Sequence, residues 1–179
     1  WGAATVEKLA VNAVMAGCRP AYLPVIIAAV EAMSDPVFNF YGIQATTHPC
    51  APLVIVNGPI RNAIGMNSSS GAYGPGWQAN ATIGRAVRLV LLNVGGAYPG
   101  VGDMSTQGAP SKYSYCVAEN EEENPWEPLH VERGFRPEQS TVTVLAGEPP
   151  HNINDREARS APDLLTTMAG TLAVVGANN

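Results

Sequence analysis

Apolar and polar residues follow the helical period in the first part of the chain. In residues 5–16, apolar side chains recur at positions i, i+3, i+4 and i+7, with Thr5 suited to cap the first turn and Gly17 to end the last. Residues 20–33 are apolar nearly all round, and Pro20 suits the first turn of a helix. We therefore expect an amphipathic helix followed by a buried one.

Two later segments repeat the helical period. Residues 79–96 place their apolar side chains on one face, with Asn80 as a plausible cap and Gly95 as a stop. Residues 160–175 begin with Ser160, a favourable capping residue, and a proline in the first turn. Both segments predict helices.

Three short segments have the pattern of strands. Residues 52–58 are a continuous apolar run typical of a strand buried on both faces, and residues 112–118 and 140–146 are rich in β-branched and aromatic residues. Because helices and strands alternate, we predict an α/β fold with a mixed sheet flanked by helices and long Gly-rich loops such as 57–76. The length fits a single domain over 1–179, as a fragment or processed chain of a larger protein.

Composition narrows the class of protein. Charged residues make up 14% of the chain and hydrophobic residues 46%, so we expect part of the surface to be covered in a homo- or hetero-oligomer with a second chain. The net charge of −5, with scattered Lys and Arg, argues against a nucleic-acid partner. The longest apolar run, 22–33, is too short to span a bilayer, so no membrane segment is expected.

The cysteines and the chain ends carry further expectations. Cys18, Cys50 and Cys116 are odd in number and lack CxxC spacing, which favours a reducing cytoplasm over a disulfide framework. The chain begins at Trp1 and ends at Asn179 just after an apolar helix. Both ends look like cuts through a larger polypeptide, and processing into two chains is one explanation.

The Gly-rich loop suggests a site for an anion. Glycines allow backbone N–H groups to converge in 67–76, and the helix behind this loop adds partial positive charge. Arg61 and Arg85 flank the loop, so we predict that they hold a substrate carboxylate, with Asn67 lining the pocket. Asp103, in "GDMSTQG", is a further candidate for substrate binding. The alternative is that the glycines and Asp103 serve turn geometry alone.

The segment 113–135, "YSYCVAENEEENPWEPLHVERGF", gathers groups with chemical potential. Cys116, Glu119, His130 and Glu132 are of the residue types that bind zinc or iron, and in a strand His130 and Glu132 would project to the same side. The spacing matches no strong metal motif. The alternative is a solvated acidic loop with Cys116 facing the core.

Within this segment, the central "ENEEEN" is interpreted as a solvated turn, because adjacent glutamates repel one another unless a cation gathers them. Weaker candidates for substrate-lining or nucleophilic residues lie elsewhere in the chain: His48, Cys50, Cys18 and the polar turn 151–155.

Several segments of the chain also resemble a known family. The resemblance is carried by "TVEKLAVNAVMAGCRPAYLPVIIAAVEAM", "LVIVNGPIR", "NATIGRAVRLVLLNVGG", "GDMSTQG" and the 113–135 segment. Together these resemble a family of mostly uncharacterised bacterial proteins associated with UGSC-type (seleno)proteins, which are distantly similar to the selenoprotein subunits of glycine and proline reductases. The resemblance implies thiol-dependent reductive or lyase chemistry in which this chain supplies the substrate pocket. The chain has no UGSC motif, so a redox role would need a partner chain or a lone cysteine.

These observations leave three hypotheses. The first is an enzyme subunit, an oxidoreductase or lyase, that binds a small carboxylate-bearing molecule between the Gly-rich loop and residues 126–135, with His130 and Glu132 as acid and base and Cys116 as redox thiol. The second is a hydrolase or lyase that uses one zinc or iron ion bound by these same three residues. The third is a non-catalytic structural subunit of an oligomer.

Overall fold

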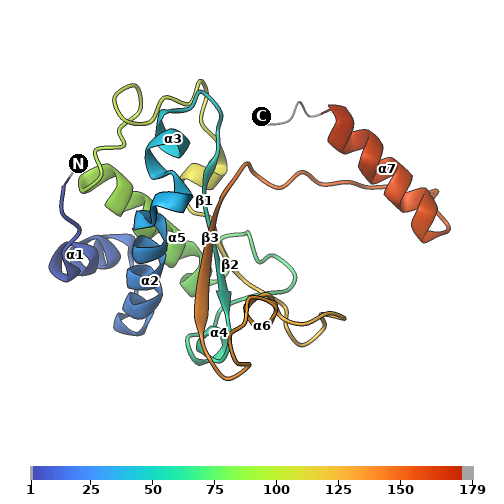
Figure 1. The fold of residues 1–179 in the computed structure, drawn as a ribbon, viewed down its shortest axis with the longest axis horizontal. Helices are drawn as coiled ribbons and strands as arrows, with labels where there is room; N and C mark the ends of the chain where they lie inside the picture. The colour runs from blue at the N-terminus through green and yellow to red at the C-terminus, as the bar shows by residue number, and fades with distance from the viewer. Residues whose placement is uncertain (1, 175–179) are drawn as a thin grey trace. The chain divides into compact units, whose positions relative to one another are not determined.

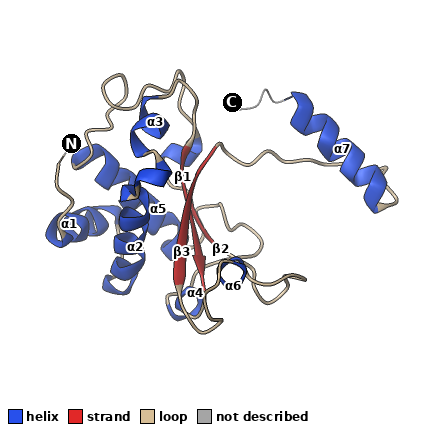
Figure 2. Ribbon diagram, viewed as in Figure 1, coloured by secondary structure: helices blue, strands red, loops and turns tan. Residues whose placement is uncertain are grey.

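The computed structural model describes residues 2–174, and contacts divide the chain into two compact units, Trp1–Glu148 and Pro149–Asn179, which are described separately (Figure 1). The single domain expected over 1–179 therefore remains a prediction. The first unit contains a three-stranded sheet in the order β2-β1-β3. Strand β1 (Ala51–Asn57) pairs in parallel with β2 (Cys116–Ala118) and antiparallel with β3 (Thr141–Gly147). With helices beside this mixed sheet, the predicted α/β class is confirmed (Figure 2).

Strand β1 is central because its apolar run suits burial on both faces. Val54 and Val56 are fully buried, and β1 faces Cys116 to Ala118 of β2 in parallel register. Strand β2 is shorter than the 112–118 segment that we predicted, because a 3-10 turn at Pro110–Lys112 precedes it. Strand β3 follows the predicted 140–146 closely.

Three helices build the core of the first unit. Helices α1 (Val6–Ala16), α2 (Leu23–Ser34) and α5 (Gln78–Asn93) pack on one another beside the sheet, as Figure 1 shows. Ile26 and Ile83 are fully buried where they meet, together with Val54 of β1. The apolar stripes read from the sequence therefore face this core.

The predicted ends of these helices are partly right. Thr5 caps α1, accepting a hydrogen bond from Lys8 N at 3.3 Å, and Gly17 ends it in a left-handed conformation. The predicted 20–33 helix starts as a 3-10 turn, Pro20–Tyr22, before α2. Asn80, however, is not a cap: α5 begins before it, at Gln78.

Several short helices were not predicted. These are α3 (Phe40–Ala45), α4 (Ile60–Ala63), α6 (Leu129–Glu132) and a 3-10 turn at Pro36–Phe38. Four to six residues carry too little periodicity to distinguish a helical turn from a loop.

The second unit contains α7 (Ala161–Val174), as predicted for 160–175, although residue 175 lies outside the described residues. Ser160 Oγ donates to the Asp163 carboxylate at 2.7 Å, and Asp163 N donates back to Ser160 Oγ at 3.4 Å. This exchange fixes the first turn of α7.

Within residues 2–174, no single helix has the length and apolar character needed to cross a membrane. A bent pair, Pro20–Ser34 with Pro36–Ala45, could do so by length and composition alone. The apolar side chains of α2 are used in the core, where Ile26 and Ala29 are fully buried.

Gly84 provides a test of the packing between α5 and the segment before β2. A Cβ atom at Gly84 would lie 2.6 Å from Tyr115 N and 2.4 Å from Ser114 Oγ. Gly84→Ala is therefore expected to lower the free energy of unfolding by about 2 kcal/mol in urea denaturation, although alanine is the better helix former. Gly170→Ala, in α7, meets no atom within 4 Å and should cause no loss. Equal stability of Gly84→Ala and the wild type would contradict this packing.

Candidate active site at the strand ends

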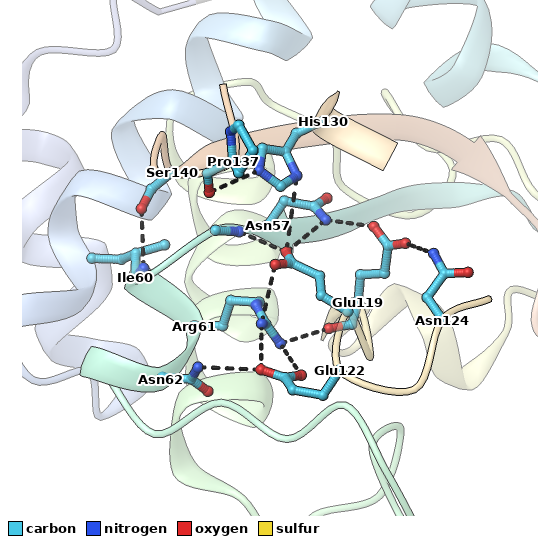
Figure 3. Close-up of polar contacts among 12 residues, drawn as sticks. Asn57, Ile60, Arg61, Asn62, Glu119, Glu122, Asn124, His130, Pro137 and Ser140 are labelled. Carbon is cyan, nitrogen blue, oxygen red and sulfur yellow. Dashed lines mark hydrogen bonds and ion pairs between the residues drawn. The ribbon is translucent and has the colours of Figure 1, made fainter. Parts of the chain in front are cut away.

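Strands β1 and β2 are parallel, so their carboxyl ends meet at one edge of the sheet. In α/β folds, ligands commonly bind at this edge. Strand β1 ends at Asn57 and turns through Gly58 into α4, while β2 leads through Glu119 into the acidic loop 119–124. The two connections lie against each other (Figure 3).

Arg61, on α4, holds the acidic loop in place. Its side chain is only 6% exposed, and its guanidinium donates to Glu119 O at 2.9 Å and to both oxygens of Glu122 at 2.7 and 3.0 Å (Figure 3). Glu121 lies 3.1 Å away from the same group. The interpretation of "ENEEEN" as a solvated turn is therefore only partly right: residues 121–123 form a turn in which Glu122 and Glu123 are exposed, but Arg61 is the cation that gathers Glu121 and Glu122.

This cluster shifts the pKa values of its members. The hydrogen bond to Glu122 raises the pKa of Arg61, although burial alone would lower it. The hydrogen bonds from Arg61 lower the pKa of Glu122 from 4.5 to about 2. Because its charge is already matched by carboxylates, Arg61 is not placed to hold a substrate carboxylate as we predicted.

Glu121 fixes the turn that follows β1. Its Oε1 accepts hydrogen bonds from Gly58 N at 2.7 Å and from Asn57 Nδ2 at 2.9 Å. Gly58 has φ +80, and a Cβ atom there would lie 2.1 Å from Gln139 O, so only glycine fits the turn.

Glu119 is held by donors from three separate segments. Its Oε2 accepts from Asn57 Nδ2, and its Oε1 accepts from Asn124 Nδ2 at 2.7 Å (Figure 3). Its Oε2 also accepts from Leu129 N at 2.9 Å. A carboxylate has about four lone-pair positions, so Oε1 retains capacity for one more donor. Glu119 is thus a charged group with a fixed orientation.

His130 lies close to Glu121, and its secondary structure and burial differ from those that we predicted. It belongs to α6 and not to a strand, so His130 and Glu132 do not share a strand face: His130 is 1% exposed, whereas Glu132 is exposed. His130 Nε2 lies 3.4 Å from Pro137 O, to which it donates a hydrogen bond in the tautomer that carries the proton on Nε2, and Nδ1 lies 3.9 Å from Glu121 Oε1. Nδ1 and Asn57 Oδ1 are buried without a hydrogen-bond partner among the residues described.

The three residues predicted as metal ligands and catalytic groups are not brought together. Cys116 is buried in the main core, where burial raises the pKa of its thiol, and Glu132 is exposed on α6. Across residues 2–174, no three His, Cys, Asp or Glu side chains are grouped to hold a metal ion. Burial also raises the pKa values of the Cys18 and Cys50 thiols.

A cavity of about 650 Å³ opens beside Glu119. The Gly-rich loop contributes Ser68, Ser69 and 71–74; the strand ends contribute Ile55, Val117, Ala118 and Glu119; and the 126–135 segment contributes Leu129. We call it the strand-end cavity. It lies between the two segments from which the sequence predicted a pocket. Of its described lining residues, one is charged, the acidic Glu119.

Asn67, predicted to bind substrate, instead holds the Gly-rich loop on α5. Asn80 Oδ1 accepts from Asn67 N at 2.9 Å, and Asn80 Nδ2 donates to Asn67 O at 2.8 Å and Ala72 O at 3.1 Å. The Asn67 side chain donates to Ser70 O and accepts from Ser69 N, both at 2.9 Å. Its side-chain amide therefore stabilises the Gly-rich loop that forms one wall of the strand-end cavity.

Arg85 and Asp103 lie together, but in another cavity, of about 710 Å³, which we call the α5 cavity. Asp103 is 3% exposed there. Burial raises its pKa, but hydrogen bonds from Ser105 and Lys112 outweigh burial and hold the pKa below its ordinary value. The two arginines that we predicted to hold one carboxylate together therefore lie at different places: Arg85 lines the α5 cavity, and Arg61 is paired with the acidic loop.

The weaker candidates lie outside both cavities. His48 Nδ1 is 3.5 Å from Glu148 Oε1, at the far end of β3. In the second unit, Asp155 Oδ1 accepts from the backbone N atoms of Glu157 and Ala158 at 2.9 Å, which is ordinary turn chemistry.

No protein-family model, curated protein or solved structure matches this chain. The resemblance to the UGSC-associated family therefore remains a prediction. Sequence reasoning named Glu119 only as a metal ligand and missed Asn57. An asparagine at the end of an apolar strand was the available signal, because buried polar groups at strand ends need partners.

The low pKa of Glu122 predicts a dependence of stability on pH. A carboxylate with a lowered folded-state pKa stabilises the fold above its unfolded pKa, and this contribution is lost as the pH falls from about 4.5 to about 2. Since the side chain is 57% exposed, we expect Glu122→Gln to cost only about 1 kcal/mol of unfolding free energy at pH 7 and nothing at pH 2. Urea denaturation at several pH values measures this loss of stability. Glu123→Gln is the control, because Glu123 is not paired with Arg61.

Burial of Cys116 predicts an unreactive thiol. Modification by a thiol reagent in the native protein should be at least about a hundred-fold slower than in urea, because the thiolate is disfavoured and access requires unfolding. Cys116→Ala should leave the number of thiols that react in the native state unchanged and lower the number in urea by one. Rapid native-state modification of Cys116 would restore it as a redox candidate.

Proposed function

We propose that this chain is an enzyme subunit that binds a small molecule with an amino or hydroxyl group in the strand-end cavity, where Glu119 accepts and returns a proton. The observation that carries this proposal is the position of Glu119 on the cavity wall, oriented by Asn57, Asn124 and Leu129 N. A general base needs a fixed orientation and free lone-pair capacity towards the ligand.

The lining supports this class of ligand. Ile55, Val117 and Leu129 offer an apolar wall for the body of the molecule, and Ser68 and Ser69 add hydroxyl groups to the lining. A carboxylate in such surroundings interacts more strongly with a cation or hydroxyl donor than it would in water. Proton removal by Glu119 is the step that a lyase would require, in agreement with the lyase chemistry that the family resemblance implied.

The proposal departs from the sequence-based hypothesis in two respects. Arg61 is paired with glutamates, so the strand-end cavity favours an amine or alcohol over a carboxylate-bearing substrate. Cys116 is buried in the core and no cysteine is among the described residues that line the strand-end cavity, so reductive chemistry in this cavity would need a thiol from a second chain. Association with such a chain and a cytoplasmic location remain predictions. A metal-dependent reaction has no set of three ligands among the described residues.

Benzylammonium is a suitable probe, because it joins an apolar ring to a cation. We expect it to bind the wild-type protein weakly and saturably in ligand-observed NMR. Glu119→Gln should weaken binding by about ten-fold, the loss of one charge-assisted hydrogen bond. Ser69→Trp, which fills the mouth of the cavity without changing its charge, should weaken it as well.

Glu132→Gln is the matched control, since Glu132 lies on α6 near Glu119 in sequence but is exposed. It should bind benzylammonium like the wild type. Unchanged binding by Glu119→Gln, or equal loss in both Gln variants, would overturn the assignment of Glu119. A folded spectrum of each variant separates loss of the site from loss of the fold.

A further inference from the structure

We propose that the α5 cavity is a second site, which binds a small organic oxyanion with Arg85 as its main contact. The α5 cavity shares no lining residue with the strand-end cavity, so this inference does not depend on the proposed function. The two sites differ in the sign of their charge: the strand-end cavity carries Glu119, and the α5 cavity carries more cations than anions.

Among the described residues, three cations line the α5 cavity against one carboxylate. Asp103 pairs with Arg88 at 2.9 Å and with Lys112 at 3.0 Å. Its Oδ1 also accepts from Ser105 Oγ at 2.8 Å. One negative charge thus serves two buried cations, whose side chains are only 10% and 9% exposed, and one of their positive charges is left over.

Excess positive charge away from water is costly unless an anion approaches it. Arg88 offsets part of this cost with hydrogen bonds to Ala97 O at 3.1 Å and Gln44 Oε1 at 3.4 Å. Both acceptors are uncharged, so they orient the Arg88 guanidinium but do not neutralise its positive charge.

Arg85 adds a further cation, one turn before Arg88 on α5. Over residues 2–174 its side chain has neither a hydrogen-bond acceptor nor an ion-pair partner. A guanidinium presents five donors in a planar fork that matches two oxygens of a carboxylate or phosphate. Arg61, in contrast, has its charge matched by Glu121 and Glu122, so of these two arginines Arg85 is the one without a carboxylate partner in the described part of the chain.

The rest of the lining indicates an organic anion. Leu92, Pro99, Pro110 and Tyr113 form apolar surface, while Thr106 and Gln107 offer polar groups. A cavity of about 710 Å³ has room for a molecule the size of an aromatic or branched aliphatic acid. Carboxylates and phosphate monoesters share the oxyanion that Arg85 would recognise.

Benzoate and phenyl phosphate, titrated separately into the wild-type protein at low salt, test this site. At least one of them should bind saturably, and added salt should weaken binding because the contact is ionic. Arg85→Ala should weaken binding of that probe by at least about ten-fold, and Arg85→Lys, which keeps the charge but loses the fork, should weaken it less. The relative affinity of the two probes shows which oxyanion the site prefers.

Arg133→Ala removes an exposed positive charge from α6's C-terminal end and should leave binding of both probes unchanged. Glu119→Gln should also leave it unchanged, and Arg85→Ala should leave benzylammonium binding unchanged, so the two sites fail or succeed separately. The proposal is overturned if neither probe binds, if Arg85→Ala binds like the wild type, or if Arg133→Ala loses as much affinity as Arg85→Ala.

Discussion

The buried guanidinium of Arg61 is the interaction on which the strand-end architecture depends. A cation whose side chain is 6% exposed requires counter-charges, and the loop after β2 supplies Glu121 and Glu122. By drawing this loop over the turn after β1, Arg61 also brings Glu119 next to Asn57. Two connections far apart in the sequence thus become one polar cluster at the parallel edge of the sheet.

This closure has consequences for both cavities. Since Arg61 is neutralised by the loop, Glu119 sets the charge of the strand-end cavity. The uncommitted positive charge lies instead on α5, where Arg88 and Lys112 share Asp103 and Arg85 stays unpaired within the described part of the chain. A molecule with an amine at one end and an acid at the other would not find both partners in either cavity. The arrangement therefore favours two ligands, or one ligand and a separate anion.

Periodic features of the sequence were sufficient for the fold class. The stripes of α1 and α5, the apolar run of β1 and the β-branched residues of β3 are each visible in the local sequence. Asn80 shows the limit: its polar side chain resembled a cap, but it is buried within α5 because the loop at Asn67 needs its amide. Such a partner is set by tertiary packing, which local spacing does not encode.

The candidate site was harder to predict for the same reason. His130 was predicted to share a strand face with Glu132, but its placement on a four-residue helix, away from Cys116, could not be predicted from alternation. The glutamates of 119–124 looked solvated because their cation lies about 60 residues earlier in the chain, at Arg61. Charge pairing over such separations is decided by which strands neighbour each other, and here β1 and β2 do.

Amide hydrogen exchange in an Arg61→Met variant tests the central role of Arg61 most directly. Gly58 N donates to Glu121 and Leu129 N donates to Glu119, so both amides report whether the acidic loop stays closed. Our account predicts that their protection falls by at least about ten-fold, while Val54 N, bonded to Tyr115 O between β1 and β2, stays protected. Unchanged protection of Gly58 and Leu129 would show that the loop closes without Arg61 and would contradict the account.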